Sequence, residues 1–155
     1  MIQRDYIERL IQQCAEFLGR ILRLREAGEL DPALRLVDEA ANELLGPLRP
    51  LLDRLEASTA VQVAGRLDID RIRLYAALLG EQALIHGGRG DAMRACLSCR
   101  RALELLAAVS LAGGRLGDND LRRIAVLTTT LDVDQLDDRY RDELRRLAAR
   151  GEEPR

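Results

Sequence analysis

The residues that could carry chemistry in this chain are few, and two cysteines have the most specific spacing. Cys96 and Cys99 form a Cys-x-x-Cys motif, which in redox proteins sits at a helix N-terminus, where the helix dipole lowers a thiol pKa. Here the motif falls inside a predicted helix, so we interpret both cysteines as core residues. A redox pair and a metal site are the alternatives, although a tetrahedral zinc site would find only Cys14 and His86 as further soft ligands.

The one histidine and a group of aspartates are the other candidates. His86 precedes a glycine-rich turn at the end of a predicted helix. A cation there complements the helix dipole, so we interpret His86 as a C-terminal cap, with a general base as the alternative. The aspartates lack the glycine and distal glutamate of a calcium-binding loop and are predicted to be N-terminal helix charges, with a weak divalent-cation site as the alternative: Asp132, Asp134, Asp137 and Asp138.

Composition excludes several classes of function. Every basic residue is arginine, and the absence of lysine excludes Schiff-base chemistry and a phosphate-binding P-loop. The net charge is −2 and the arginine pairs lie among acidic residues, which argues against a nucleic-acid partner. We therefore expect a chain that is not an enzyme and that uses no cofactor and no metal.

The same sequence predicts a location. The N-terminus lacks the apolar region of a secretory signal, and no uncharged apolar stretch approaches the ~18 residues that a membrane span needs. Three cysteines, an odd number, do not form a disulfide framework. We expect a cytoplasmic protein with no membrane partner.

The elements that position these residues occur twice. An offset of 62 residues relates Gly28 to Gly90, and the match extends without a gap over about 40 residues. It also pairs Cys96 and Cys99 with residues predicted to be in the core. Further pairs at this offset are Ala33 with Ala95, Ala40 with Ala102, Leu34 with Cys96, and Val37 with Cys99.

This repetition predicts the domain organisation. We expect a single all-α domain over residues 1–155 with about seven helices: one helical hairpin at about 4–45, a second at about 66–107, and C-terminal helices at about 118–150. Asp31 is predicted to cap the second helix and Asp132 the last one. Residues 57–66 are predicted to be a loop or a frayed lead-in to the next helix.

The spacing of the turn glycine and the small residues resembles the tetratricopeptide repeat. That repeat places small residues five and twelve positions after a turn glycine, as at Gly28, Ala33 and Ala40. The opening of the chain is also similar to a group of small bacterial helical proteins of unknown function, which implies a bacterial source. The resemblance to the tetratricopeptide repeat implies an array of two helical hairpins that is closed by a C-terminal capping pair of helices. It also implies that this array serves as a protein–protein interaction surface.

The first helix carries a second apolar row beside its core row. A helix this apolar is either central in the fold or covered by another subunit. We predict a non-enzymatic interaction module that self-associates as a homodimer; its other protein partner is not identified. The alternative is a helical regulatory domain that senses a small ligand or peptide. The candidate interface residues are Ile11, Ala15, Leu18, Leu22 and Arg25.

Overall fold

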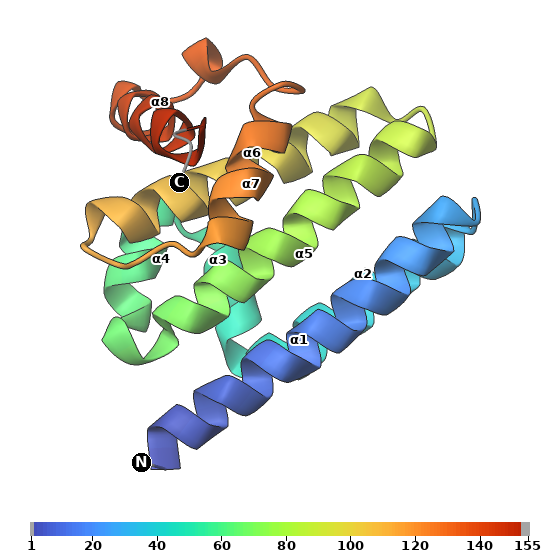
Figure 1. Cartoon of the computed structure of the whole chain (residues 1–155), viewed down its shortest axis with the longest axis horizontal. Helices are drawn as coiled ribbons and strands as arrows, with labels where there is room; N and C mark the ends of the chain where they lie inside the picture. Colours follow the sequence, from blue (N-terminus) through green and yellow to red (C-terminus); the bar gives the residue numbers. More distant parts are fainter. Residues whose placement is uncertain (1, 153–155) are drawn as a thin grey trace.

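All regular structure in the described part of the chain is helical. The computed structural model describes residues 2–152, and Figure 1 shows them as a layered set of helices without strands. The all-α prediction of about seven helices is confirmed. The described residues form eight α-helices, one of them only six residues long: α1 (Ile2–Glu26), α2 (Leu30–Leu45), α3 (Arg49–Arg54), α4 (Ala57–Ala64), α5 (Ile69–Gly88), α6 (Ala92–Leu111), α7 (Asp118–Leu127) and α8 (Asp138–Glu152). Short 3-10 turns lie between them at Gly46–Leu48, Arg66–Asp68 and Val133–Gln135.

The two predicted hairpins turn in the same way. Gly28 and Gly90 have φ angles of 77° and 79°, in the left-handed region that favours glycine. After α1, the amide of Glu29 donates to the carbonyl of Leu24 at 2.8 Å; after α5, the amide of Asp91 donates to that of His86 at 2.9 Å. Both turns are therefore Schellman motifs, and the 62-residue offset holds at the level of single hydrogen bonds.

Helix α5 lies at the centre of the fold. It packs against α1, α2, α4, α6 and α7, and Figure 1 shows α1 and α7 on opposite sides of it. Helix α1 runs in the same direction as α5, because Tyr6 accepts a hydrogen bond from Arg71 and, further along both helices, Arg25 Nε lies 3.3 Å from Glu81 Oε2. Helices α1 and α7 thus lie on either side of α5, and both are on the same face of the molecule.

Small and branched aliphatic side chains fill the core. Ala40 and Ala102, which the offset pairs, are both completely buried, and such small side chains allow neighbouring helices to approach closely. The buried residues of all the long helices form one continuous cluster. The core row of α1 belongs to this cluster and consists of Leu10, Cys14, Phe17 and Ile21. The second apolar row of α1 lies outside the cluster.

Three predicted helix boundaries are wrong. Residues 57–64 form a helix because the Glu56 carboxylate accepts hydrogen bonds from the amides of Ser58 and Thr59, at 3.0 and 3.3 Å. Helix α2 begins one residue before Asp31 and has no side-chain cap. The last helix does not begin at Asp132, which instead caps the 3-10 turn by accepting from the Asp134 amide at 3.0 Å.

The two turn glycines give a first prediction. We expect Gly28→Ala and Gly90→Ala each to lower the free energy of unfolding by about 1–2 kcal/mol, because a Cβ atom disfavours the left-handed backbone. Urea denaturation measures this cost. Gly87→Ala is the matched control, since Gly87 is helical with open space around its Cβ position, and it should keep or raise stability. Equal stability of all three variants would contradict the assigned turns.

Candidate functional site

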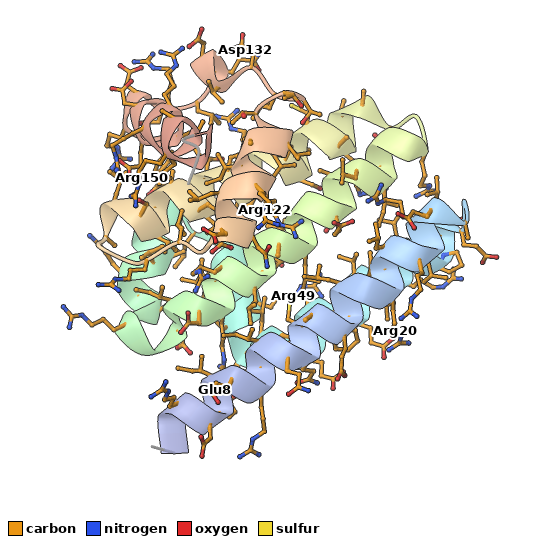
Figure 2. The ribbon with its side chains drawn as sticks, viewed as in Figure 1. Glu8, Arg20, Arg49, Arg122, Asp132 and Arg150 are labelled. Atoms are coloured by element: carbon orange, nitrogen blue, oxygen red, sulfur yellow. The ribbon has the colours of Figure 1, made fainter. Side chains whose placement is uncertain are left out.

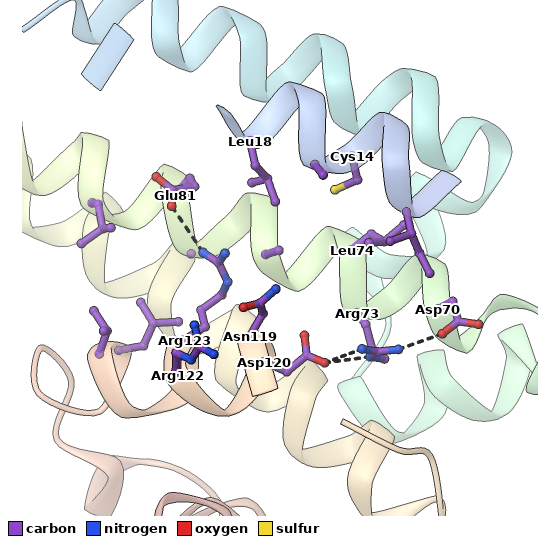
Figure 3. Close-up of a pocket in the computed structure, with 17 residues that line it drawn as sticks. Cys14, Leu18, Asp70, Arg73, Leu74, Glu81, Asn119, Asp120, Arg122 and Arg123 are labelled. Carbon is purple, nitrogen blue, oxygen red and sulfur yellow. Dashed lines mark hydrogen bonds and ion pairs between the residues drawn. The ribbon is translucent and has the colours of Figure 1, made fainter. Parts of the chain in front are cut away.

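Three helices enclose a groove in the molecule. It holds about 400 Å³ and lies over α5, with α1 as one wall and α7 as the other (Figure 3). From Asp70 to Leu84 the floor follows four turns of α5, or about 21 Å at 1.5 Å per residue. The groove is therefore long and narrow, with the proportions of a short helix.

Most of the groove surface is apolar, and helical periodicity explains why. The α1 wall carries Ile11, Ala15 and Leu18, which recur every three or four residues and so lie on one face. The floor repeats the pattern with Leu74 and Ala77. On the α7 wall, Val126 closes the apolar strip.

A cluster of charges fixes one end of the groove. Arg73 on α5 donates to Asp120 Oδ2 on α7 from two nitrogens, at 2.6 and 2.9 Å, and its third contact is with Asp70 at 2.9 Å. The amide of Gly117 also donates to Asp120 at 2.8 Å, which fixes the start of α7. Figure 3 shows the bonds from Arg73 to Asp120, which join floor and wall.

Glu81 joins both walls to the floor further along α5. Its side chain is buried (9% exposed for the residue) and accepts from Arg25 of α1 at 3.3 Å and from Arg123 of α7 at 3.4 Å. Gly80 makes room for the second contact, because a Cβ there would lie 3.0 Å from Arg123 Cδ. A buried carboxylate with two guanidinium partners is a stable arrangement, whereas the same carboxylate without them would be costly.

The remaining polar groups give the groove a small positive charge. Arg122 has no hydrogen bond or ion pair within residues 2–152, and it is exposed on the α7 wall (Figures 2 and 3). Three arginines and three carboxylates line the groove: Arg73, Arg122 and Arg123, and Asp70, Glu81 and Asp120. Arg25 binds Glu81 from outside the lining and brings the total to one net positive charge. An occupant with a carboxylate would complement this charge.

The structure brings most of the predicted interface residues to this site. Ile11 (44% exposed), Ala15 and Leu18 line the groove. Leu22 (38% exposed) continues the same row beyond the lining, and Arg25 binds Glu81. The α7 wall was missed, although the polar residues Asn119, Arg122 and Arg123 recur at helical spacing before Val126 and could have indicated a second face.

The cysteine prediction is half wrong. Cys99 is buried and its thiol donates to the Leu127 carbonyl, with the sulfur 3.4 Å from that oxygen, but Cys96 is exposed. The residues that the 62-residue offset pairs with these cysteines differ in burial in the same way. Leu34, the partner of Cys96, is half-buried, and Val37, the partner of Cys99, is buried. Burial raises the pKa of the Cys99 thiol, and it raises the pKa of Cys14, beside the groove, to about 11.

The histidine and the aspartates carry no assembled site. His86 is buried with its Nδ1 unpaired, and burial lowers its pKa, which disfavours the cationic cap that we predict from the sequence. The aspartates contact arginines and backbone amides; Asp138, for example, lies 2.9 Å from Arg141. Within residues 2–152, no three His, Cys, Asp or Glu side chains come together as a metal site would require.

The exposure of the thiols gives a second prediction. We expect one thiol per native chain to react rapidly with a disulfide reagent at pH 8, because Cys96 is exposed while Cys14 and Cys99 are buried with raised pKa values. Absorbance at the released chromophore measures the stoichiometry. Cys96→Ser should remove the rapid phase, and rapid reaction of a second thiol would contradict the burial described above.

Comparison of this chain with protein-family models, with curated proteins and with solved structures finds no match. None of the helices in the described part of the chain combines the length and apolar composition of a membrane-spanning helix.

Proposed function

We propose that this chain is a non-enzymatic protein-interaction module that binds an α-helix of its partner along the α1/α5/α7 groove. The observation that carries the proposal is the groove, about 21 Å long and mostly apolar, that three helices line with side chains at helical spacing. A groove of this kind accepts the apolar face of an amphipathic helix through residues at i, i+3, i+4 and i+7.

The charges of the groove favour an acidic segment on that helix. Arg73 and Glu81 already have partners, so a helix can cover the apolar floor without leaving either charge unpaired. Arg122 is the exception, and a carboxylate on the incoming helix would pair with it. Such a contact fixes orientation and partner choice more than affinity.

The nature of the lining supports a binding role. The one nucleophilic thiol at the groove, Cys14, has a raised pKa, which disfavours the reactive thiolate. The resemblance of the two hairpins to the tetratricopeptide repeat favours a role in protein–protein interaction. The free cysteines suit the cytoplasmic location that we propose with it.

A small-ligand sensor is the second candidate, and the size of the groove is the observation that favours it. A volume of about 400 Å³ lies within the range of small-molecule sites. A metabolite that raises the melting temperature of the native protein, but not of a Val126→Glu variant, would support this candidate over a helical partner.

Photocrosslinking from the α7 wall tests the leading proposal. We expect a benzophenone amino acid at Val126, which is 50% exposed, to capture a discrete protein in the source cells, because the partner helix would cover this position. The matched control is Val63, which is 57% exposed on α4 and does not line the groove. Mass spectrometry of the crosslinked band identifies the partner.

A substitution in the opposite wall completes this test. Ile11→Glu should lower the yield from Val126 by about tenfold or more, because it buries a carboxylate against the apolar face of the partner helix. Ile11 is exposed enough for the variant to fold. Equal capture from Val126 and Val63, or a yield that Ile11→Glu leaves unchanged, would contradict the proposal.

A further inference from the structure

We infer that a second copy of this chain docks along α1, so that the two α1 helices form an antiparallel pair across a two-fold axis. This inference rests on the proposed function, because it names the occupant of the α1 wall. It is carried by one exposed row of side chains, the α1 row, which we define as Glu8, Ile11, Ala15, Leu18, Leu22 and Arg25.

The α1 row has the spacing of a helix-pairing seam. Its members alternate at steps of three and four residues, which is the heptad pattern that keeps one face toward a partner helix. The adjacent row of α1 is buried against this chain's own helices, whereas most of the α1 row is exposed. Glu8, Ile11, Ala15 and Leu22 are exposed, and Leu18 and Arg25 are half-buried.

The row is complementary to itself when reversed. Its midpoint lies between Glu16 and Phe17, and residues at equal distances from that point would face each other in an antiparallel pair. Glu8 then faces Arg25 of the second copy, so opposite charges meet at both ends. Between these ends, Ile11 of one copy faces Leu22 of the other, two large side chains. The small Ala15 faces the large Leu18.

A parallel pair would lose this complementarity. It would bring Glu8 against Glu8 and Arg25 against Arg25, two like-charge contacts that disfavour that orientation. It would also place Ala15 against Ala15 and leave a gap at the centre of the seam. The charge pattern thus selects both the partner and the direction of the helices.

Both end residues remain available for this contact. Glu8 lies on the N-terminal half of α1 (Figure 2), and its only ion pair in the described residues is with the exposed Arg4, 3.4 Å away. Arg25 binds Glu81 through Nε, which leaves its terminal nitrogens free to donate. An Arg25 held by Glu81 is also ordered before the second copy arrives, which lowers the entropy lost on association.

Two residues separate this inference from the proposed function. Leu22 belongs to the α1 row but does not line the groove, and Val126 lines the groove but does not belong to the row. A second copy on the row depends on Leu22, whereas a helix lying deep between α1 and α7 depends on Val126.

Sedimentation equilibrium of the full chain tests the pairing. We expect a dimer at micromolar concentrations. Leu22→Glu and Glu8→Arg should each raise the dimer dissociation constant by about tenfold or more, because the first buries a carboxylate and the second sets two guanidinium groups against each other at both ends of the seam. Val126→Glu should raise the constant by less than Leu22→Glu does, because Val126 lies on the opposite wall of the groove and not on the row. The matched controls are Val63→Glu and Glu39→Arg, which make the same chemical changes at exposed positions outside the row.

Spin labels test the direction of the helices. In a Cys96→Ser background, labels at Arg9 and at Glu16 report two separations between the copies. The antiparallel pair predicts a distance at residue 9 more than about 10 Å longer than at residue 16, because residue 9 is about 11 Å from the midpoint along each helix. A parallel pair would give equal distances.

The outcomes are distinct. A protein that stays monomeric at high micromolar concentration, or equal label distances, would overturn the inference and leave the groove proposal to its own crosslinking test. A dimer that Val126→Glu disrupts and Leu22→Glu does not would place the second copy in the groove, which contradicts the α1 row and supports the groove. Loss of the dimer in the Val63→Glu or Glu39→Arg control would show that the effect is not specific to the row, and would also contradict the inference.

Discussion

The buried carboxylate of Glu81 is the contact on which the shape of this molecule depends. It sits on the central helix and binds one arginine from α1 and one from α7, two helices that α5 otherwise keeps apart. Taking a carboxylate out of water is costly unless it is paired, so the position of each flanking helix is tied to the requirement of this one group. Gly80, which precedes it, leaves the space that Arg123 occupies.

This arrangement explains why an apolar strip remains open. Charges hold α7 at two levels of α5, at Arg73 and at Glu81, whereas α1 is held by its core row and by the Arg25–Glu81 pair. Between those levels the half-buried Leu74 and the buried Ala77 form the floor of the groove, and the exposed apolar side chains Ile11 and Val126 lie on its two walls. An exposed strip of this kind, rimmed by polar groups, is typical of an interaction surface. The α1 row extends it past the groove to Leu22.

Sequence reasoning could predict the parts of the fold that local rules determine. The offset between Gly28 and Gly90 placed both hairpins, because a left-handed turn residue and its helix spacing are local properties. The exposure of Cys96 could not be obtained in this way, because its repeat partner Leu34 was itself predicted to be in the core and is only half-buried. The contact of Cys99 with α7 could not be predicted either, since α7 has no counterpart in the first hairpin. Helix α4 was missed because glutamate is an uncommon cap. The groove itself depends on long-range ion pairs, which periodicity in one helix does not reveal.

Hydrogen exchange of a Glu81→Gln variant measures whether this carboxylate holds both flanking helices, because the substitution removes the charge and keeps the shape. If Glu81 holds both walls, amides in the second half of α1 and in α7 should exchange about tenfold faster or more than in the native protein, while those of α6 should keep their protection. Faster exchange in only one wall, a uniform change throughout the chain, or no change would contradict the account.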